Sequence, residues 1–258
     1  MIRLVVNRHW SICVAGPSGE DVRNVLERAG KAGVDRLHLP WADAARIVKP
    51  PGALEPAWSF AQSGVEIAGI DVSPFTAECD DDFERQSDDI YLEMQVAKRL
   101  GLTAVSLDGG TKSAVAFEYL TPALTRLTVL ADRLGLALCL HNRADTRLEQ
   151  PIDLQRVFVE VAAENLSIDL DVLEFHRSQV NPCEAIWAFG ERIKKVRLAD
   201  TDAGEPVPLS RGEINIEAVI EALKEAEFDG LFVLTLGDDA GAVERLRSDR
   251  ALIESAWR

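Results

Sequence analysis

The chain has 258 residues, of which 47% are hydrophobic, 6% aromatic and 28% charged. This composition is typical of a soluble globular protein and excludes a disordered or collagen-like chain. The 28 Lys and Arg residues are outnumbered by 43 Asp and Glu residues, so the net charge is −15. A negative charge of this size opposes binding to nucleic acid and to anionic membranes. We therefore expect neither as a partner.

The cysteines and the N-terminal segment exclude further classes. The four cysteines are far apart and form no CxxC pair, so zinc ribbons and dithiol redox motifs are unsupported: Cys13, Cys79, Cys139 and Cys183. We expect reduced thiols. Near the N-terminus, Asn7, Arg8 and His9 interrupt the apolar run, which fits neither a signal peptide nor a membrane span. These observations predict a cytoplasmic protein.

Short apolar segments recur along the chain at intervals of about 30 to 40 residues, the length of one β-loop-α unit. They are rich in Val, Ile and Leu and do not alternate cleanly with polar residues, which is typical of parallel strands buried on both faces. The eight predicted strands are Ile2–Val6, Val34–Leu39, Val65–Ile70, Thr103–Leu107, Ala137–His141, Leu166–Asp171, Lys195–Leu198 and Leu231–Leu236.

The segments between these strands show helical periodicity. The clearest predicted helices are Asp21–Ala32, Asp88–Leu100, Leu120–Leu134, Ile216–Ala226 and Ala242–Trp257. Gly101 and Gly135 follow two of them directly, as expected of left-handed helix caps. The acidic run Glu78–Asp89 lacks the spacing and the glycine of an EF-hand loop. We predict that this run is a solvated loop leading into the next helix.

Eight strands alternating with about eight helices over this length predict a single (β/α)8 TIM barrel, one domain spanning residues 1–258. The competing architecture is a doubly wound open sheet. Its dinucleotide-binding form is weakened because no GxGxxG motif follows the first predicted strand. No Pro- or Ser-rich linker divides the chain, which favours one domain over two.

Functional side chains of such barrels lie at the carboxyl ends of the strands and in the loops that follow. Applied to the predicted strands, this rule selects a ring of acids, imidazoles, guanidinium groups and one hydroxyl. Its members are His38, Asp108, His141, Arg143, Asp169, Asp171, Glu174, Arg197, Asp200 and Thr235. Together they predict a polar pocket for a small molecule.

Four segments of the second half of the chain carry a family resemblance: LADRLGLALCLHNR, LSIDLDVLEFH, ERIKKVRLAD and PLSRGEINIEAVIEALKEAEFDGLFVLTL. They resemble the sugar phosphate isomerase/epimerase family of xylose isomerase-like TIM barrels, which includes inosose dehydratases, hydroxypyruvate isomerases, ketose epimerases and an endonuclease branch. The resemblance is clearest over Tyr91–Leu236. It implies the barrel fold, but not one activity, because these relatives differ in chemistry.

The resemblance also implies where a metal would bind. The family usually holds Mn²⁺, Mg²⁺ or Zn²⁺ with Glu, Asp, His and Glu at the ends of strands five to eight. The matching positions here are His141, Asp171, Arg197 and Thr235. Arginine stays protonated and offers no lone pair to a metal. We therefore expect no cofactor, and a divalent metal only if Glu174 or Asp200 joins His141 and Asp171.

The first functional hypothesis is an isomerase or epimerase that needs no metal and acts on a small carbohydrate, a sugar phosphate or a related hydroxy-carbonyl compound. Its predicted catalytic residues are His141, Asp171, Glu174 and Arg197. Arg197 would bind an anionic oxygen of the substrate, His141 or Glu174 would move a proton, and Asp171 would orient the imidazole. The predicted substrate-binding residues are His38, Asp108, Arg143, Asp200 and Thr235. Lyase or dehydratase chemistry also fits.

The second hypothesis is a barrel without catalytic activity that serves as a small-molecule-binding or partner subunit. A third, nucleic-acid repair like that of the endonuclease branch, is disfavoured. That chemistry needs several metals and additional histidines, whereas this chain has four histidines and a charge of −15. Barrels of this family often associate, so self-association into a homo-oligomer stays open.

Overall fold

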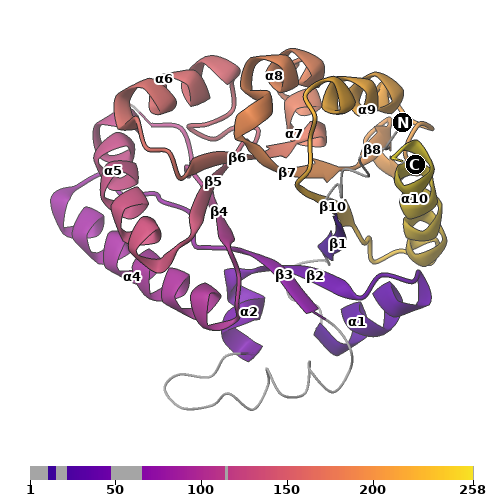
Figure 1. Cartoon of the computed structure of the whole chain (residues 1–258), viewed down its shortest axis with the longest axis horizontal. Coiled ribbons are helices and arrows are strands. Elements are labelled where there is room, and N and C mark those ends of the chain that lie inside the picture. Colours follow the sequence, from indigo (N-terminus) through magenta and orange to yellow (C-terminus); the bar gives the residue numbers. More distant parts are fainter. Residues whose placement is uncertain (1–10, 16–21, 48–65, 114–115, 258) are drawn as a thin grey trace, which may run out of the picture.

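The computed structural model describes residues 11–15, 22–47, 66–113 and 116–257. Among them, eight parallel strands close into a barrel in the order β1-β10-β7-β6-β5-β4-β3-β2 (Figure 1). The prediction of a (β/α)8 barrel is confirmed. The barrel strands are β1 (Ser11–Ala15), β2 (Arg36–Pro40), β3 (Glu66–Asp71), β4 (Ala104–Asp108), β5 (Ala137–His141), β6 (Leu166–Asp171), β7 (Ile193–Leu198) and β10 (Leu231–Thr235).

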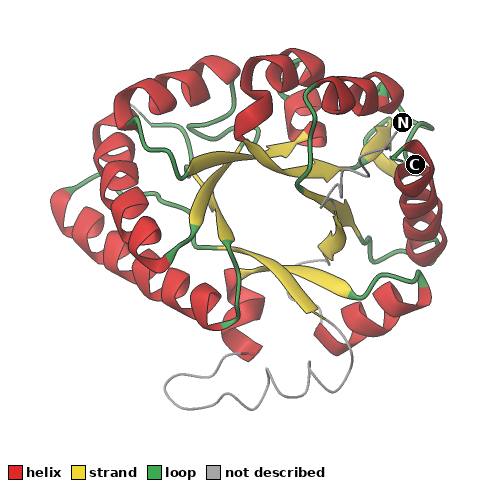
Figure 2. Ribbon diagram, in the orientation of Figure 1, coloured by secondary structure: helices red, strands yellow, loops and turns green. Residues whose placement is uncertain are grey.

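Helices form a ring outside the strands (Figure 2). They are α1 (Val22–Lys31), α2 (Trp41–Ile47), α4 (Asp80–Arg99), α5 (Ala116–Leu134), α6 (Pro151–Val161), α7 (Val172–Arg177), α8 (Pro182–Phe189), α9 (Ile216–Glu225) and α10 (Ala242–Ala256). A short 3-10 helix (Gly190–Arg192) precedes β7, and an antiparallel hairpin of β8 (Asp200–Asp202) and β9 (Glu205–Val207) follows it. No helix in the described part of the chain is long and apolar enough to span a membrane.

Two predicted elements differ most from the observed ones, and α5 begins four residues before the predicted Leu120. The predicted first strand, Ile2–Val6, lies outside the described residues, and the strand that closes the barrel against β10 is Ser11–Ala15. The acidic run predicted as a loop belongs largely to α4, which begins at Asp80 rather than Asp88. Aspartates in the first turn compensate the helix dipole, so this run begins the helix instead of preceding it.

Alternation along the strands divides the side chains between two environments. On β6, Leu166, Ile168 and Leu170 belong to the apolar core between strands and helices. The intervening Asp169 is fully buried and hydrogen bonds to side chains of β4 and β7, so it points into the barrel. The outer layer therefore supplies the apolar burial, whereas the barrel interior carries polar and charged groups.

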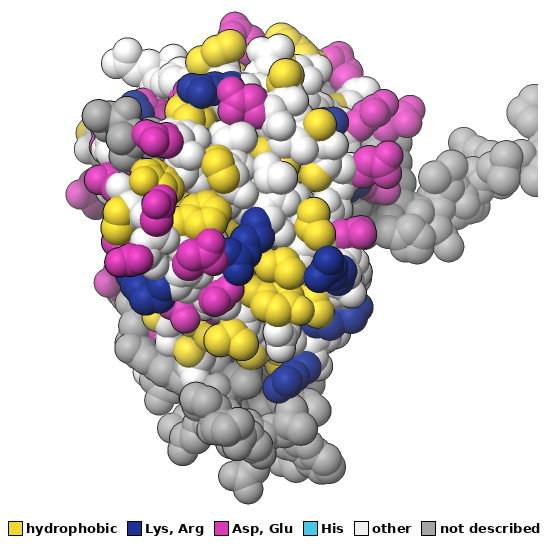
Figure 3. Space-filling view, turned by 90° about the vertical axis from the view of Figure 1, so that its left-hand side faces the viewer, with side chains coloured by type: hydrophobic (Ala, Val, Ile, Leu, Met, Phe, Trp, Pro, Cys, Tyr) yellow, Lys and Arg dark blue, Asp and Glu magenta, His cyan; other side chains and the backbone are white. Residues whose placement is uncertain are grey.

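The helix ring is also held by ion pairs across neighbouring helices. Arg126 of α5 donates to Asp88 of α4 at 2.7 Å and also pairs with Glu84 one turn earlier. Figure 3 shows the side of the molecule on which these helices lie: acidic and basic side chains are interspersed with hydrophobic ones. Isolated apolar side chains are normal on such surfaces. Leu92 and Val129, each more than half exposed, are examples on α4 and α5.

Candidate functional site

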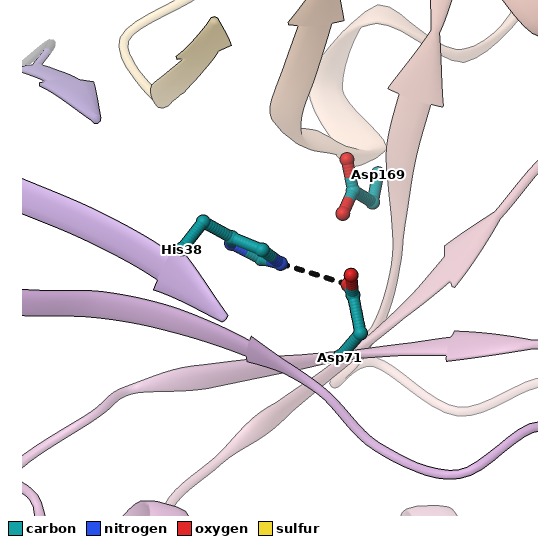
Figure 4. Close-up of side chains that lie close together, drawn as sticks. All are labelled: His38, Asp71 and Asp169. Carbon is teal, nitrogen blue, oxygen red and sulfur yellow. Dashed lines mark hydrogen bonds and ion pairs between the residues drawn. The ribbon is translucent and has the colours of Figure 1, made fainter. Parts of the chain in front are cut away.

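Four charged or ionisable side chains meet inside the barrel: His38 of β2, Asp71 of β3, Asp169 of β6 and Arg197 of β7. We call them the inner cluster. Figure 4 shows three of them converging from different strands. His38 and Asp169 are fully buried, whereas 28% of the Asp71 side chain is exposed. Asp71 is therefore the member of the cluster most open to a bound molecule.

Arg197 joins the two carboxylates. Its Nε donates to both oxygens of Asp169 at 3.1 Å, and its Nη2 donates to Asp169 Oδ2 at 2.6 Å. On the other side, its Nη1 donates to Asp71 Oδ2 at 3.2 Å and its Nη2 contacts Asp71 Oδ1. Each of the three guanidinium nitrogens thus has a carboxylate partner. The donors that we expected to bind a substrate oxygen are directed at side chains of the protein itself.

A second cation lies on the far side of Asp169. The Lys195 ammonium donates to Ser106 Oγ at 2.8 Å, and Ser106 Oγ donates to Asp169 Oδ2 at 2.6 Å. Lys195 and Ser106 are both almost completely buried. The barrel interior thus places two carboxylates beside two cations, which balances the charge of the group. Buried charges are tolerated when they are paired and hydrogen bonded in this way.

The electrostatics keep both carboxylates ionised. Burial alone would raise the pKa of Asp71, but the Arg197 charge and the His38 imidazole outweigh it and hold that pKa well below its usual range. For Asp169 too, the Arg197 charge overcomes burial and depresses the pKa strongly. Burial lowers the pKa of His38, and the nearby Arg197 opposes its protonation further. We infer a neutral imidazole between ionised carboxylates.

The environment of His38 fixes how its ring is used. Its Nε2 lies 2.7 Å from Asp71 Oδ1, and because an ionised carboxylate can only accept, the proton of the neutral ring is assigned to Nε2. The other nitrogen, Nδ1, is buried and has no hydrogen-bond partner among the described residues. Nδ1 faces Gly69 of β3, where a Cβ atom would come within 2.3 Å of it. The glycine is therefore what leaves room for the ring.

A second pair lies nearer the carboxyl end of the barrel. His141 Nε2 at the end of β5 is 3.3 Å from Asp171 Oδ2 at the end of β6. We call these two residues the mouth pair. Asn142 fixes the backbone of Asp171 from both sides: its Nδ2 donates to Asp171 O at 2.9 Å, and its Oδ1 accepts from Asp171 N at 2.7 Å. Both members of the mouth pair are partly exposed: 13% of the His141 side chain and 15% of the Asp171 side chain reach solvent.

Two further predicted residues surround the mouth pair. Glu174 lies on α7, whose N-cap is Asp171: Asp171 Oδ1 accepts from Glu174 N at 3.0 Å. The Glu174 carboxylate accepts from Ala144 N at 2.9 Å and from Arg177 Nη1 at 2.6 Å, which ties the loop after β5 to α7. Glu174 therefore lies close to the mouth pair, but its oxygens are occupied by protein donors.

Arg143 and Asp108 form a looser contact at the same end of the barrel. Arg143 Nη1 is 3.4 Å from Asp108 Oδ2, and 60% of the Arg143 side chain is exposed. Asp108 Oδ1 also accepts from Gly110 N at 2.7 Å, which fixes the loop after β4. In contrast to Arg197, Arg143 contacts one carboxylate among the described residues, and most of its side chain is exposed.

The remaining two predicted residues are placed differently. Asp200 is buried, and its carboxylate accepts hydrogen bonds from three backbone N–H groups of its own loop, those of Thr201, Gly212 and Ile214, at 2.9, 2.9 and 3.1 Å. It thus braces the loop that follows β7. Thr235 ends β10 opposite Ala15 and is exposed. The structure does not join either residue to the inner cluster or to the mouth pair by a described hydrogen bond.

The sequence-based selection misses part of the inner cluster. It names Asp169 without giving it a role and omits Asp71. It also omits Ser106 and Lys195, which connect to the cluster through Asp169. Asp71 follows the predicted third strand directly, so the strand-end rule that selected His38 applies to it equally. Lys195 precedes Arg197 by two residues on β7, and a period of two along a strand indicates a shared face. The sequence carries no local signal that Arg197 pairs with Asp71 across the barrel, or that Lys195 reaches Asp169 through Ser106.

Comparison with known proteins decides the family. A profile described as xylose isomerase-like TIM barrel matches residues 21–256, nearly the whole chain. The chain belongs to this family. No curated protein matches it significantly.

Several solved structures share the fold of this xylose isomerase-like barrel. The 3-keto-D-glucoside 4-epimerase YcjR from E. coli is 13% identical with a TM-score of 0.77, covering 95% of this chain and 98% of its own. The probable 3-DHS dehydratase AsbF from Bacillus anthracis is 15% identical with a TM-score of 0.74, covering 90% and 93%. The IOLI protein, solved with a bound zinc atom, is 18% identical with a TM-score of 0.76, covering 95% and 97%. At such identities the likeness shows the fold alone.

The residues of this barrel do not fit the metal that the family usually holds. At the four positions where the resemblance predicts metal ligands, the mouth pair supplies an imidazole and a carboxylate, but Arg197 and Thr235 stand at the other two. A protonated guanidinium cannot ligate a metal and repels a cation nearby. In the inner cluster, His38, Asp71 and Asp169 bring potential ligand atoms within 4.8 Å of one another, yet all three contact Arg197.

Proposed function

We propose that this barrel binds a small carbohydrate or related hydroxy-carbonyl compound at its carboxyl end and moves a proton within it, without a divalent metal. The mouth pair carries this proposal: His141 lies at a strand end, is partly exposed, and has a carboxylate 3.3 Å from one ring nitrogen. An imidazole oriented by a carboxylate is a common general acid–base arrangement. The names of two fold neighbours, an epimerase and a probable dehydratase, agree with this class of chemistry.

The proposed step begins with neutral His141 removing a proton from the carbon next to the substrate carbonyl. The electron pair of the broken C–H bond forms a C=C bond, and the carbonyl oxygen takes up the negative charge as an enediolate. Asp171 stabilises the imidazolium, and exposed Arg143 is placed to donate to the anionic oxygen or to a phosphate. To complete an isomerisation, the proton of the adjacent hydroxyl passes to the enediolate oxygen, so that a new C=O bond forms at the carbon that lost its hydrogen, and the His141 imidazolium returns its proton to the former carbonyl carbon.

Arg197 has a different part in this proposal from the one expected of a substrate-binding arginine. Its donors hold Asp71 and Asp169, so it shapes the floor of the pocket from within the protein. The exposed part of Asp71 then offers an ionised acceptor to a substrate hydroxyl. Asp71 is a poor proton acceptor for catalysis, because its depressed pKa makes it a weak base.

One observation favours a second candidate, a binding barrel without turnover. Glu174, the other predicted proton carrier, accepts hydrogen bonds from protein donors at both oxygens, which leaves His141 as the predicted acid–base group for a substrate. If substrate chemistry has been lost, the pocket would still recognise a polyhydroxylated or anionic compound through Arg143 and Asp71.

The test combines binding with isotope exchange. Protein freed of metal by chelator is screened by thermal shift against ketoses, aldoses and their phosphates, and each stabilising compound is then incubated in D₂O and followed by proton NMR. We expect deuterium to enter the carbon next to the carbonyl. His141→Asn should slow the exchange by about 100-fold or more, the usual contribution of a general base. His176→Asn is the matched control, because His176 pairs with exposed Glu213 outside the mouth pair.

Three outcomes separate the candidates. Exchange lost in His141→Asn and kept in His176→Asn supports the enzyme. A compound that stabilises the fold but exchanges no deuterium over days supports the binding barrel. Exchange that survives in His141→Asn contradicts the role given to the mouth pair.

A further inference from the structure

The inner cluster has the geometry of a cation site whose centre is taken by a side chain. One imidazole and two carboxylates offer ligand atoms within 4.8 Å of one another, from His38, Asp71 and Asp169. Nitrogen and oxygen donors so close together are what divalent transition metals prefer. Arg197 Nη2 contacts all three: it is 3.2 Å from His38 Nε2 and 2.6 Å from Asp169 Oδ2, and it touches Asp71 Oδ1.

We propose that the guanidinium of Arg197 is a permanent, built-in cation that occupies a latent divalent-metal site formed by His38, Asp71 and Asp169. In the native protein it excludes a divalent ion from these ligands, and its removal uncovers a site for one. The proposal rests on the metal-free part of the proposed function and gives it a structural reason. It does not depend on whether His141 transfers a proton.

Charge balance supports this assignment. Arg197 and Lys195 together offset the charges of Asp71 and Asp169, so a divalent ion added beside them would leave two uncompensated positive charges in a buried space. Without the guanidinium, the same space would hold two carboxylates, one ammonium and a neutral imidazole, whose Nε2 binds an ion once its proton moves to Nδ1. The remaining negative charge then attracts a cation.

The chemistry of the side chain makes the occupation permanent. A metal ion exchanges with solvent, whereas Arg197 is anchored to β7 and keeps its proton at any pH the fold survives. Its planar fork also suits two carboxylates at once, which a lysine ammonium would hold with fewer fixed hydrogen bonds. The observed contacts follow that preference: Nε and Nη2 bond to Asp169, and Nη1 bonds to Asp71.

The experiment measures metal binding without any turnover. Wild-type protein, Arg197→Ala and the matched control Arg245→Ala are stripped with chelator and titrated with Mn²⁺ and with Zn²⁺ by calorimetry. Arg245 is chosen because it too is an arginine in an ion pair, with Asp239 at 2.6 Å. Its side chain is 13% exposed, against 12% for Arg197. We expect one saturable site in Arg197→Ala and none in the other two proteins.

A second substitution locates the new site. Adding Asp71→Asn to Arg197→Ala should weaken the uncovered site by about 10- to 100-fold or abolish it, because a ligand carboxylate is lost. The thermal midpoint of Arg197→Ala should lie below that of wild type and rise when Mn²⁺ or Zn²⁺ is added, since a ligand that binds only the folded state stabilises it. The midpoint of wild type should not respond in this way.

Two results would overturn the proposal. One is a saturable divalent site in wild-type protein that Asp169→Asn removes, because the guanidinium would then not exclude the metal. The other is a folded Arg197→Ala protein, verified by circular dichroism, that binds neither ion. If Arg197→Ala does not fold, Arg197→Met keeps the aliphatic stem without the charge, and the same titration is made on it. Even if neither variant folds, a saturable divalent site in wild-type protein would still contradict the proposal.

Discussion

At the scale of single residues, the interior of this barrel shows how buried charge is made tolerable. Every ionised group of the inner cluster has a partner of opposite charge, and Ser106 connects Asp169 to Lys195. The weak point is His38, whose buried Nδ1 lacks a hydrogen bond among the described residues and depends on Gly69 for space. Packing at this glycine therefore controls the position of the imidazole and, through it, of Asp71.

Replacing Gly69 with alanine tests this dependence. The added Cβ would lie 2.3 Å from His38 Nδ1, so the ring must move and its bond to Asp71 must lengthen or break. We expect the free energy of unfolding, measured in urea, to fall by about 1–3 kcal/mol, the usual cost of overpacking a core. Gly30→Ala is the control: nothing lies within 4 Å of its Cβ position on α1. That change should be neutral or stabilising by up to about 1 kcal/mol. Equal effects at the two glycines would contradict the account.

At the scale of elements, the sequence predicts the bounds of the strands better than it predicts the side-chain contacts across the barrel interior. Ala137–His141 and Leu166–Asp171 were predicted with the bounds observed, because short runs of buried Val, Ile and Leu between polar residues mark parallel strands. The start of α4 was missed because its first turns are acidic and resemble a loop. In the structure, Arg85 pairs with Asp82 at 2.6 Å within the helix, and Phe83 packs against Phe75.

The mouth pair could be anticipated from the sequence, whereas the inner cluster could not. His141 and Asp171 end neighbouring strands, so adjacency follows from strand order alone. Arg197 and Asp71 are 126 positions apart on β7 and β3, and their contact depends on how a long side chain crosses the closed barrel. No periodicity or motif encodes that crossing. The family resemblance predicts that Arg197 stands at a metal-ligand position, but it does not predict the carboxylates that the arginine contacts.

The last helix offers a pH-dependent prediction at the same scale. Asp249 of α10 accepts a hydrogen bond from Leu209 N at 2.8 Å, and burial raises its pKa to about 6, although Arg245 nearby opposes the rise and Asp200 adds to it. In the unfolded chain this carboxyl ionises near pH 4. Between about pH 4 and pH 6, the folded state therefore keeps a proton on Asp249 that the unfolded chain has lost. This proton binding stabilises the fold at low pH, and the contribution to stability is lost as the pH rises through about 6.

Asp249→Asn should remove this dependence. The amide oxygen can still accept from Leu209 N, but it carries no charge to bury. Relative to wild type, the variant should gain about 1 kcal/mol of unfolding free energy between pH 5 and pH 7.5. Urea unfolding at both pH values measures the difference. Asp229→Asn, at an exposed position just before β10, is the control that should show no such gain. A constant difference between Asp249→Asn and wild type at both pH values would show that the carboxyl does not titrate in this window.

At the scale of the whole molecule, the structure shows where the excess negative charge behind the net charge of −15 lies. The inner cluster and Lys195 contribute equal numbers of acidic and basic groups, so the excess acid lies outside the barrel interior. On the side shown in Figure 3, charges of both signs are mixed, and Arg126 bridges to Asp88 across two helices. Exposed pairs of this kind contribute little individually. The balance between general repulsion and local pairing decides how the fold responds to salt.

We expect general repulsion to dominate, so sodium chloride should stabilise this protein. Raising the salt from about 0.02 M to 0.5 M shortens the screening length from more than 20 Å to about 4 Å, which suppresses repulsion among distant acids more than attraction within close pairs. A gain of about 1 kcal/mol corresponds to a thermal midpoint about 2–4 °C higher for a domain of this size. Calorimetry at pH 7.5 measures the change, with potassium chloride as a check against specific ion binding. A midpoint that falls with both salts would mean that exposed ion pairs such as Arg126–Asp88 outweigh the excess negative charge. Because the pairs of Arg197 are buried and screened least, Arg197→Ala should shift the midpoint by a similar amount at low and at high salt.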